Sequence, residues 1–372
     1  MAERALGLEQ IIQWIVSAPV LPWIFFFGKI LFIFTLGFGV IAPVMIWVER
    51  RVAAFVQDRV GPNRVGPLGL LQSLADGIKL LLKEDLRPDE VRPFFFILAP
   101  ALAAIPAAMA FAVVPFGPET TLGGLLSSPA RLQIAPLNVG LLYVLAIGSL
   151  AVYSIALAGW ASNNKFSVMG SLRASAQMIS YELAMGMAVV AVILMSGSVD
   201  LYDIVKAQTN NWFILSIPGL IAFLIFVPAM FAETNRTPFD LPEAEAELVV
   251  GFHTEYSGMK FGLFFLAEYV NMTTLSAMCV LFFFGGWELL PFGITWESVG
   301  YNVDQYWFSW MLPFAWFAAK VAFFLFVFVW VRWTLPRFRY DQLMSLGWKT
   351  LVPIGIANIV LVAGLLSFGG GF

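Results

Sequence analysis

The stretch FFFILAPALAAIPAAMAFAVVP, residues 94–115, decides the fold class because it contains no charged side chain. About 20 apolar residues in a helix are enough to cross the hydrocarbon core of a bilayer. Comparable runs recur along the chain, and 60% of its 372 residues are hydrophobic whereas 12% are charged. This apolar share and the mean hydropathy of +0.84 exceed those of ordinary soluble domains. The sequence therefore predicts an all-α polytopic membrane protein.

The apolar runs, read against turn and charge signals, predict eight transmembrane helices in a single integral membrane domain over residues 1–372. The expected spans lie near 23–48, 94–115, 137–159, 174–197, 212–232, 261–284, 310–331 and 350–369. The first span holds Lys29 and follows the acidic Glu9 instead of a basic segment with a cleavage site. We therefore interpret it as a retained span and not as a signal peptide.

The Lys and Arg residues separate by side of the membrane. Sixteen of the 21 fall in the alternate loops 49–93, 160–173, 233–260 and 332–349, whereas the opposite side carries only Arg4, Arg131 and Lys206. Short loops rich in Lys and Arg stay in the cytoplasm. The sequence therefore predicts that these four loops are cytoplasmic and that both termini lie on the non-cytoplasmic side.

The scarcity of cysteine and histidine limits the chemistry of the chain. Cys279 is the only cysteine and His253 is the only histidine. No disulfide can form within one chain, and an iron–sulfur cluster needs four Cys or a set of Cys and His. We therefore expect neither a metal site nor a redox group held by this chain alone.

The first cytoplasmic loop contains an amphipathic segment from Leu68 to Lys83. Its leucines and isoleucine recur at helical spacing and oppose a polar stripe that includes Asp76 and Lys79. Such a helix is expected to lie in the membrane interface and not to cross it. Arg50 and Arg51, beside Glu49 at the end of the first span, are placed to line an entrance. The alternative for these basic residues is attraction to lipid headgroups.

Two carboxylates are expected inside the membrane at matching depths. Glu182 lies eight residues beyond Ala174 and Glu268 lies seven beyond Phe261, in spans that both begin at the cytoplasmic side. An ionisable side chain in a span costs roughly 2.5–3.5 kcal/mol or more unless it faces protein or water, which indicates a function such as proton handling. The alternative is a structural hydrogen bond or ion pair with a nearby side chain: Tyr181, Tyr269, Lys29 or Lys320.

The segment AETNRTPFDLPEAEAEL, residues 232–248, is the most acidic of the chain. Together with Glu255 it brings six carboxylates against only Arg236 and Lys260. Crowded carboxylates in a poorly hydrated place titrate collectively, which suits stepwise proton movement. A solvated acidic loop is the alternative interpretation, but this segment is flanked by spans and leads toward Glu268.

Taken in order, these motifs resemble the H subunit family of NADH-quinone oxidoreductase, respiratory complex I. The resemblance covers about Glu49 to Lys349 and rests on many motifs at family-like spacing: WVERR (47–51), GPNRVGP (61–67), LLQSLADGIK (70–79), GWASNNK (159–165), ISYE (179–182), the segment 232–248 and RFRYDQL (337–343). It implies a membrane subunit that forms a quinone entrance and couples quinone reduction to proton translocation in a bacterial inner membrane.

The resemblance also implies roles for individual residues and partners. Candidates near the quinone path are Glu49, Arg50, Arg51, Asp76, Lys79, Arg236 and Asp240. Candidates for proton coupling are Glu182, Glu233, Glu243, Glu245, Glu247, Glu255 and Glu268. Quinone would be the substrate, FMN and iron–sulfur clusters would belong to partner subunits, and the partners would be peripheral iron–sulfur and quinone-site subunits, neighbouring membrane subunits and lipid, with no nucleic acid.

Three alternatives remain open at this point. The chain could be the homologous subunit of a membrane-bound hydrogenase or of a complex fed by a donor other than NADH. It could be an independent proton-coupled transporter, although the sequence shows no internal repeat of the kind that many transporters contain. It could also be a purely structural anchor, in which case the buried glutamates would be dispensable for turnover.

Overall fold

The computed structural model describes residues 27–28, 30–32, 35–121, 129–242, 248–306 and 308–368. These residues are helical apart from loops and one isolated bridge between Thr120 and Ala130. In chain order the elements are η1 (Thr35–Ile41), α3 (Ala42–Val56), η2 (Pro67–Gly69), α4 (Gln72–Leu82), α5 (Pro93–Ala112), α6 (Gly140–Gly148), α7 (Leu150–Ala161), α8 (Lys165–Ser196), α9 (Leu201–Lys206), η3 (Phe213–Leu215), α10 (Ile217–Glu233), η4 (Gly251–His253), α12 (Gly258–Phe283), α13 (Met311–Thr334), α14 (Tyr340–Ser345), η5 (Leu346–Leu351) and α15 (Val352–Ser367).

Within the described residues, seven helices are long and apolar enough to cross a membrane. They run over Ile30–Val56, Pro93–Ala112, Gly140–Ala161, Lys165–Ser196, Gly258–Phe283, Met311–Thr334 and Tyr340–Ser367. The span expected near 212–232 corresponds to α10, which is apolar but has 17 residues and is therefore about 25 Å long. The all-helical polytopic class is confirmed. The count of eight spans and the single domain stay predictions.

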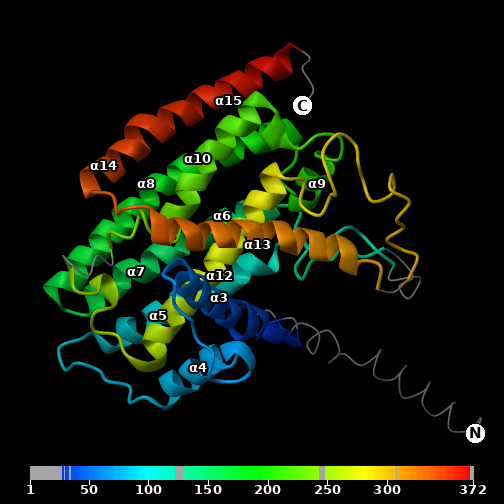
Figure 1. Ribbon diagram of the computed structural model, residues 1–372. Coiled ribbons are helices and arrows are strands. Elements are labelled where there is room, and N and C mark those ends of the chain that lie inside the picture. Colours follow the sequence, from blue (N-terminus) through cyan, green and yellow to red (C-terminus); the bar gives the residue numbers. More distant parts are fainter. Residues whose placement is uncertain are drawn as a thin grey trace, which may run out of the picture.

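The helices pack as a bundle in which α12 is the span most enclosed by protein. Figure 1 shows α8 and α10 side by side beneath α14 and α15, while α13 crosses in front of α12. Small side chains such as Ala103, Ala107, Ala184 and Ala188 are buried where α5 and α8 meet their neighbours. Small residues let transmembrane helices approach closely, which compensates for the weak hydrophobic drive in lipid.

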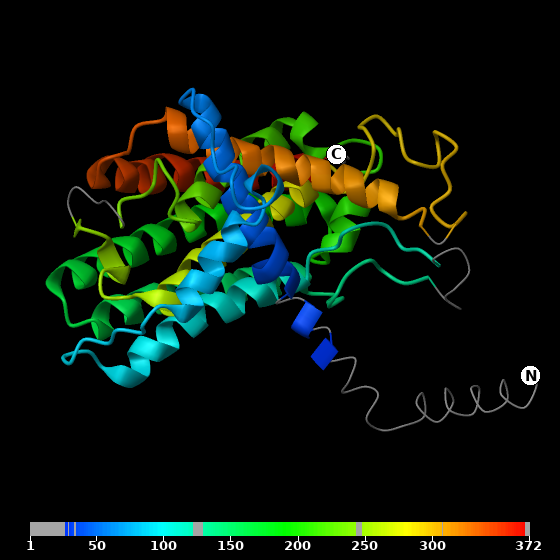
Figure 2. The same cartoon turned by 60° about the horizontal axis from the view of Figure 1, so that its bottom comes forward.

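The interfacial helix expected between Leu68 and Lys83 is present as α4. The apolar side chains of Leu74, Ile78 and Leu82 are exposed along it. Figure 2 shows α3 and α4 next to each other in front of the bundle. An apolar helix face of this kind suits the boundary between headgroups and acyl chains.

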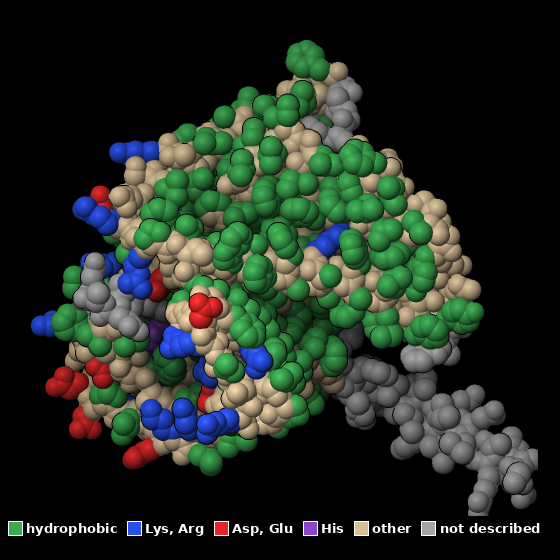
Figure 3. Space-filling model, viewed as in Figure 1, with side chains coloured by type: hydrophobic (Ala, Val, Ile, Leu, Met, Phe, Trp, Pro, Cys, Tyr) green, Lys and Arg blue, Asp and Glu red, His purple; other side chains and the backbone are tan. Residues whose placement is uncertain are grey.

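Charged side chains gather at one end of the molecule. Figure 3 shows Lys, Arg, Asp and Glu at the left of the face, over the ends of α7, α8 and α14 and over the α4 region, while hydrophobic side chains cover most of the remainder. A band of apolar surface next to a charged end is the expected pattern for a protein that sits in a bilayer with one end in water.

Substitution of a glycine in the turn before α4 tests how this helix is attached to the preceding loop. Gly69 has φ +76°, and a Cβ there would clash with the Pro62 carbonyl group. Gly77, inside α4, has open space where a Cβ would lie. We expect Gly69→Ala to destabilise the folded chain by about 1–3 kcal/mol, because the strain of a left-handed backbone and the steric clash both raise the free energy of the folded state. Gly77→Ala should be neutral or stabilising by up to about 1 kcal/mol.

Thermal unfolding midpoints of the two purified variants in the same detergent provide the measurement. A midpoint for Gly69→Ala at or above that of Gly77→Ala would contradict this account of the turn.

Candidate functional site

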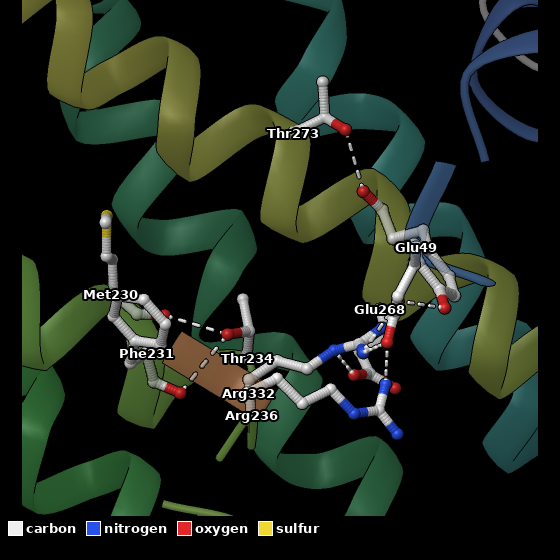
Figure 4. A network of polar contacts seen from close by, with 9 residues as sticks. Glu49, Met230, Phe231, Thr234, Arg236, Glu268, Thr273 and Arg332 are labelled. Carbon is white, nitrogen blue, oxygen red and sulfur yellow. Dashed lines mark hydrogen bonds and ion pairs between the residues drawn. The ribbon is translucent and has the colours of Figure 1, made fainter. Parts of the chain in front are cut away.

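A buried carboxylate, Glu49, lies at the centre of the polar contacts between the spans. Helix α3 continues beyond the expected end of the first span at Val48 as far as Val56, and this places Glu49 inside the protein with 6% exposure. Arg236 Nη1 donates to its two oxygens at 3.0 and 3.1 Å. Tyr269 Oη donates to it at 2.6 Å, and Arg332 Nη1 also donates to it. Three separate segments therefore converge on one carboxylate, as Figure 4 shows.

Arg236 links this carboxylate to a second one. It follows α10, is 5% exposed, and also forms an ion pair with Glu268 of α12. Its guanidinium lies over the Tyr269 ring, 4.6 Å from the ring centroid. Glu49, Glu268, Arg236 and Arg332, which we call the ion cluster, thus combine two negative with two positive groups. A buried charge without a partner is costly, so each member depends on the others.

A cavity of about 380 Å³ borders the ion cluster. Glu49, Tyr269 and Arg332 form part of its wall. The remaining lining mixes apolar with polar side chains: Ile46, Arg50, Ala53, Ala54, Gln57, Arg59, Val60, Phe265 and Trp333. Cavities of about 300–1,000 Å³ with apolar walls and a few convergent polar groups are typical of small-molecule sites. We call it the entrance cavity.

The loop between α3 and α5 is held to α3 near this cavity. Arg50 pairs with Asp76 of α4, which also accepts a hydrogen bond from Gln72 at 3.1 Å. Partial burial raises the pKa of Asp76, but the hydrogen bonds and the charge of Arg50 outweigh it, so the pKa is lowered overall. Arg51 donates to the carbonyl oxygens of Pro62 and Leu68 at 3.1 and 3.0 Å and thereby holds the turn.

The structure separates the expected quinone-path residues into groups. Glu49 and Arg50 line the entrance cavity. Arg236 does not line it but donates a hydrogen bond to Glu49. Lys79 is exposed on α4. Asp240 does not line this cavity and pairs with Arg337 at 2.8 Å, but it lies close enough to Arg332 and Arg236 for their charges to act on it. Burial raises the pKa of Asp240, although the Arg337 guanidinium opposes that shift.

Two of the expected proton-coupling residues meet in one place. Glu233, the last residue of α10, and Glu268 both line a cavity of about 60 Å³, which we call the inner cavity. Among the described residues, Glu233 Oε2 has no hydrogen-bond partner although it is buried. A buried carboxylate oxygen requires a partner, and water in this polar cavity can supply one.

The other described acidic candidates, Glu182 and Glu255, do not line the inner cavity. Glu182 is half-buried on α8, and Glu255 accepts a hydrogen bond from Asn164 Nδ2 at 2.6 Å. Glu243, Glu245, Glu247 and Lys29 lie outside the described residues. His253 lines the inner cavity, and its burial lowers its pKa to about 4, so it is neutral at pH 7. In the described part of the chain, no group of three His, Cys, Asp or Glu could hold a metal ion.

Sequence reasoning did not select Arg332 as a site residue and considered Tyr269 only as a structural partner of Glu268. Arg332 lies 283 residues from Glu49 along the chain, and Tyr269 lies 220 residues from it. The only local signals were an arginine in the last turn of a span and a tyrosine beside a membrane carboxylate. Neither signal indicates which carboxylate the side chain reaches.

Comparison with known proteins gives a consistent result. A family model described as NADH dehydrogenase matches residues 28–363. The NADH-quinone oxidoreductase H subunit 1 of Geobacter metallireducens is 52% identical over 326 residues, which cover 88% of this chain and 92% of the relative. The H subunit of Leptospira biflexa is 53% identical over 322 residues, 85% of this chain and 87% of the relative.

The H subunit 1 of Cytophaga hutchinsonii is 48% identical over 329 residues, which are 88% of this chain and 93% of that relative. Identity at this level along most of both chains, together with the family match, settles the resemblance that the motifs indicated. The chain belongs to the H subunit family of NADH-quinone oxidoreductase.

Proposed function

We propose that this chain forms the quinone entrance of a proton-pumping NADH-quinone oxidoreductase and the first part of its proton-coupling path. The observation that carries the proposal is the ion cluster, because it touches the entrance cavity at Glu49 and the inner cavity at Glu268. A change of charge on one side can therefore act on a carboxylate on the other side. The names of the relatives favour an NADH-fed complex over a hydrogenase.

The entrance cavity suits a quinone headgroup. Its apolar side chains match the ring, while Arg50 and Arg332 can donate hydrogen bonds to the two carbonyl oxygens. Quinone becomes quinol by taking up two electrons and two protons. The electrons would come from an iron–sulfur cluster in a partner subunit, with FMN further away in another, because the described part of this chain supplies no ligand set for a cluster.

Coupling follows from the electrostatics of the ion cluster. Two unit charges 4 Å apart interact by about 4 kcal/mol at an effective dielectric constant of 20. An energy of this size changes a protonation equilibrium constant about a thousandfold. Negative charge developing on a bound quinone would attract Arg332 and Arg236 and weaken their hold on the carboxylates. Glu268 would then take up a proton and could pass it through the inner cavity to Glu233.

The remaining assignments belong to the same proposal. The charged end seen in Figure 3 would face the bacterial cytoplasm and dock the peripheral iron–sulfur and quinone-site subunits. The apolar surface would contact lipid and neighbouring membrane subunits of the inner membrane, and both termini would lie on the non-cytoplasmic side. Glu182, Glu255 and the acidic residues Glu243, Glu245 and Glu247 would extend the proton path, and Arg51, Asp76, Lys79 and Asp240 would shape the entrance.

Glu233→Gln tests the proton path. The substitution keeps the size of a side chain that has no ion pair in the described structure, so the fold should be retained. A positioned proton-transfer group contributes about 10²–10⁴-fold to its step, so proton pumping should be nearly abolished while quinone reduction with an uncoupler continues. The measurement is the number of protons pumped per NADH oxidised by the complex in proteoliposomes.

Glu288→Gln is the matched control. Glu288 also has a buried carboxylate oxygen without a partner in the described structure, but it lines neither the entrance nor the inner cavity. The Glu288→Gln variant should pump as many protons per NADH as the complex without the substitution. Parental pumping by Glu233→Gln would remove this residue from the path.

Arg332→Gln tests the entrance. Removing a charge-assisted hydrogen bond costs about 1.5–3 kcal/mol, so the KM for quinone should rise about 10–100-fold. Arg339→Gln is the control, because Arg339 is exposed at the same end and its ion pair is with the exposed Asp341. The assay is NADH-dependent quinone reduction over a range of quinone concentrations. Equal kinetic constants for the two variants would assign Arg332 a purely structural role.

A further inference from the structure

A third cavity, of about 50 Å³, lies deeper in the bundle beside the inner cavity. It is enclosed by α5, α6, α8, α10 and α12, and we call it the deep cavity. Glu233 and Asn271 line both the inner and the deep cavity. These two side chains therefore stand at the boundary between the two spaces.

The deep cavity follows one face of α12. Asn271 comes three residues after Glu268, and Thr274 comes three residues after Asn271. Residues spaced by three or four lie on the same helix face. Met278 and Phe282 continue the lining in the same register. At about 1.5 Å per residue, the face from Glu268 to Phe282 extends about 21 Å along the helix.

The deep cavity is mostly apolar, so its few polar groups are informative. Side-chain oxygen or nitrogen atoms reach it only from Glu233, Asn271 and Thr274 among the described residues that line it. The Thr274 hydroxyl donates to the Val270 carbonyl oxygen at 3.0 Å, which leaves its oxygen as an acceptor. A cavity volume of about 10–15 Å³ is enough for one water, provided that polar partners are present. The deep and inner cavities can each hold a short file of waters.

We infer that Asn271 is a positioning residue that holds the water joining the inner and deep cavities, so that protons continue from Glu233 along α12. This inference rests on the proposed function and extends its path. The amide both donates and accepts hydrogen bonds but does not ionise, so it can orient a water without retaining the proton. Glu233 releases its proton to this water. In each water one O–H bond forms as another breaks, so the excess proton is carried to the water beside Thr274, and Glu233 is reprotonated from Glu268 through the inner cavity.

The test compares variants of Asn271 in the purified complex reconstituted in proteoliposomes. In Asn271→Leu we expect the number of protons pumped per NADH to fall about fivefold, the loss predicted for one water-mediated hydrogen bond. Quinone reduction with an uncoupler should remain near the parental rate. Asn271→Ser supplies a hydroxyl, which also donates and accepts hydrogen bonds, and leaves room for a further water, so it should recover most of the pumping. If Asn271 had only a structural role, the Ser and Leu variants would not differ in this way in the number of protons pumped per NADH.

Thr274→Val and Thr273→Val form a matched pair of variants, because each replaces a hydroxyl by a methyl group of similar size and so disturbs the fold little. Both threonines are buried on α12 and donate to a carbonyl oxygen of their own helix, at 3.0 Å for Thr274 and 2.9 Å for Thr273. Only Thr274 of the two lines the deep cavity. Thr274→Val should therefore lower the pumping ratio, and Thr273→Val should match the parent.

The outcomes separate this inference from the proposed function. If Glu233→Gln does not pump while Asn271→Leu and Thr274→Val pump like the parent, the path leaves Glu233 in another direction and the inference is overturned alone. If Glu233→Gln itself pumps normally, the proposed proton path fails first. Reduced pumping in Asn271→Leu and Thr274→Val, with recovery in Asn271→Ser, supports the deep cavity as part of the path.

Discussion

The arrangement of this protein depends on the ion cluster of Glu49, Arg236, Glu268 and Arg332. Its members come from α3, the segment after α10, α12 and α13, and Glu49 is separated from its two arginine partners by 187 and 283 residues. Charges taken out of water are stabilised only when partners are held in good geometry. The cluster therefore fixes four segments relative to one another near one end of the bundle. The hydroxyl of Tyr269 adds a further hydrogen bond to the same carboxylate.

The lipid environment explains why such a cluster is placed inside protein. In hydrocarbon, the helices must satisfy their own backbone groups, and ionisable side chains must face protein or water. Close packing against α5, with its small residues, and against α13, α10 and α4 encloses α12. The enclosed helix then carries Glu268, Tyr269 and Asn271 in succession, so one rigid element touches the entrance cavity, the ion cluster and the inner and deep cavities.

In the proposed function, this geometry would let the chain respond electrostatically to a redox reaction that takes place beside it. A carboxylate that shares an arginine with another carboxylate is sensitive to any charge that the arginine senses, and the effect is large where the dielectric constant is low. In the proposed function, cavities large enough for water would provide a route for the proton, and the surrounding apolar side chains would limit leakage. Quinone binding and proton movement would then be separate in space and joined through Arg236.

The sequence alone determined the class of the molecule and most of its helices. Apolar runs such as 94–115 require helices in lipid, and amphipathic spacing near Leu74 and Ile78 predicted the interfacial α4, because these signals are local. The sequence also selected Glu268, because a carboxylate within an apolar span is conspicuous by itself, and Glu233 as part of the acidic segment 232–248. It did not predict that Arg236 bridges Glu49 and Glu268, that Arg332 completes the cluster, or that Asn271 borders two cavities. Those facts were decided by tertiary structure, because contacts between residues hundreds of positions apart depend on how the helices pack and not on any local pattern.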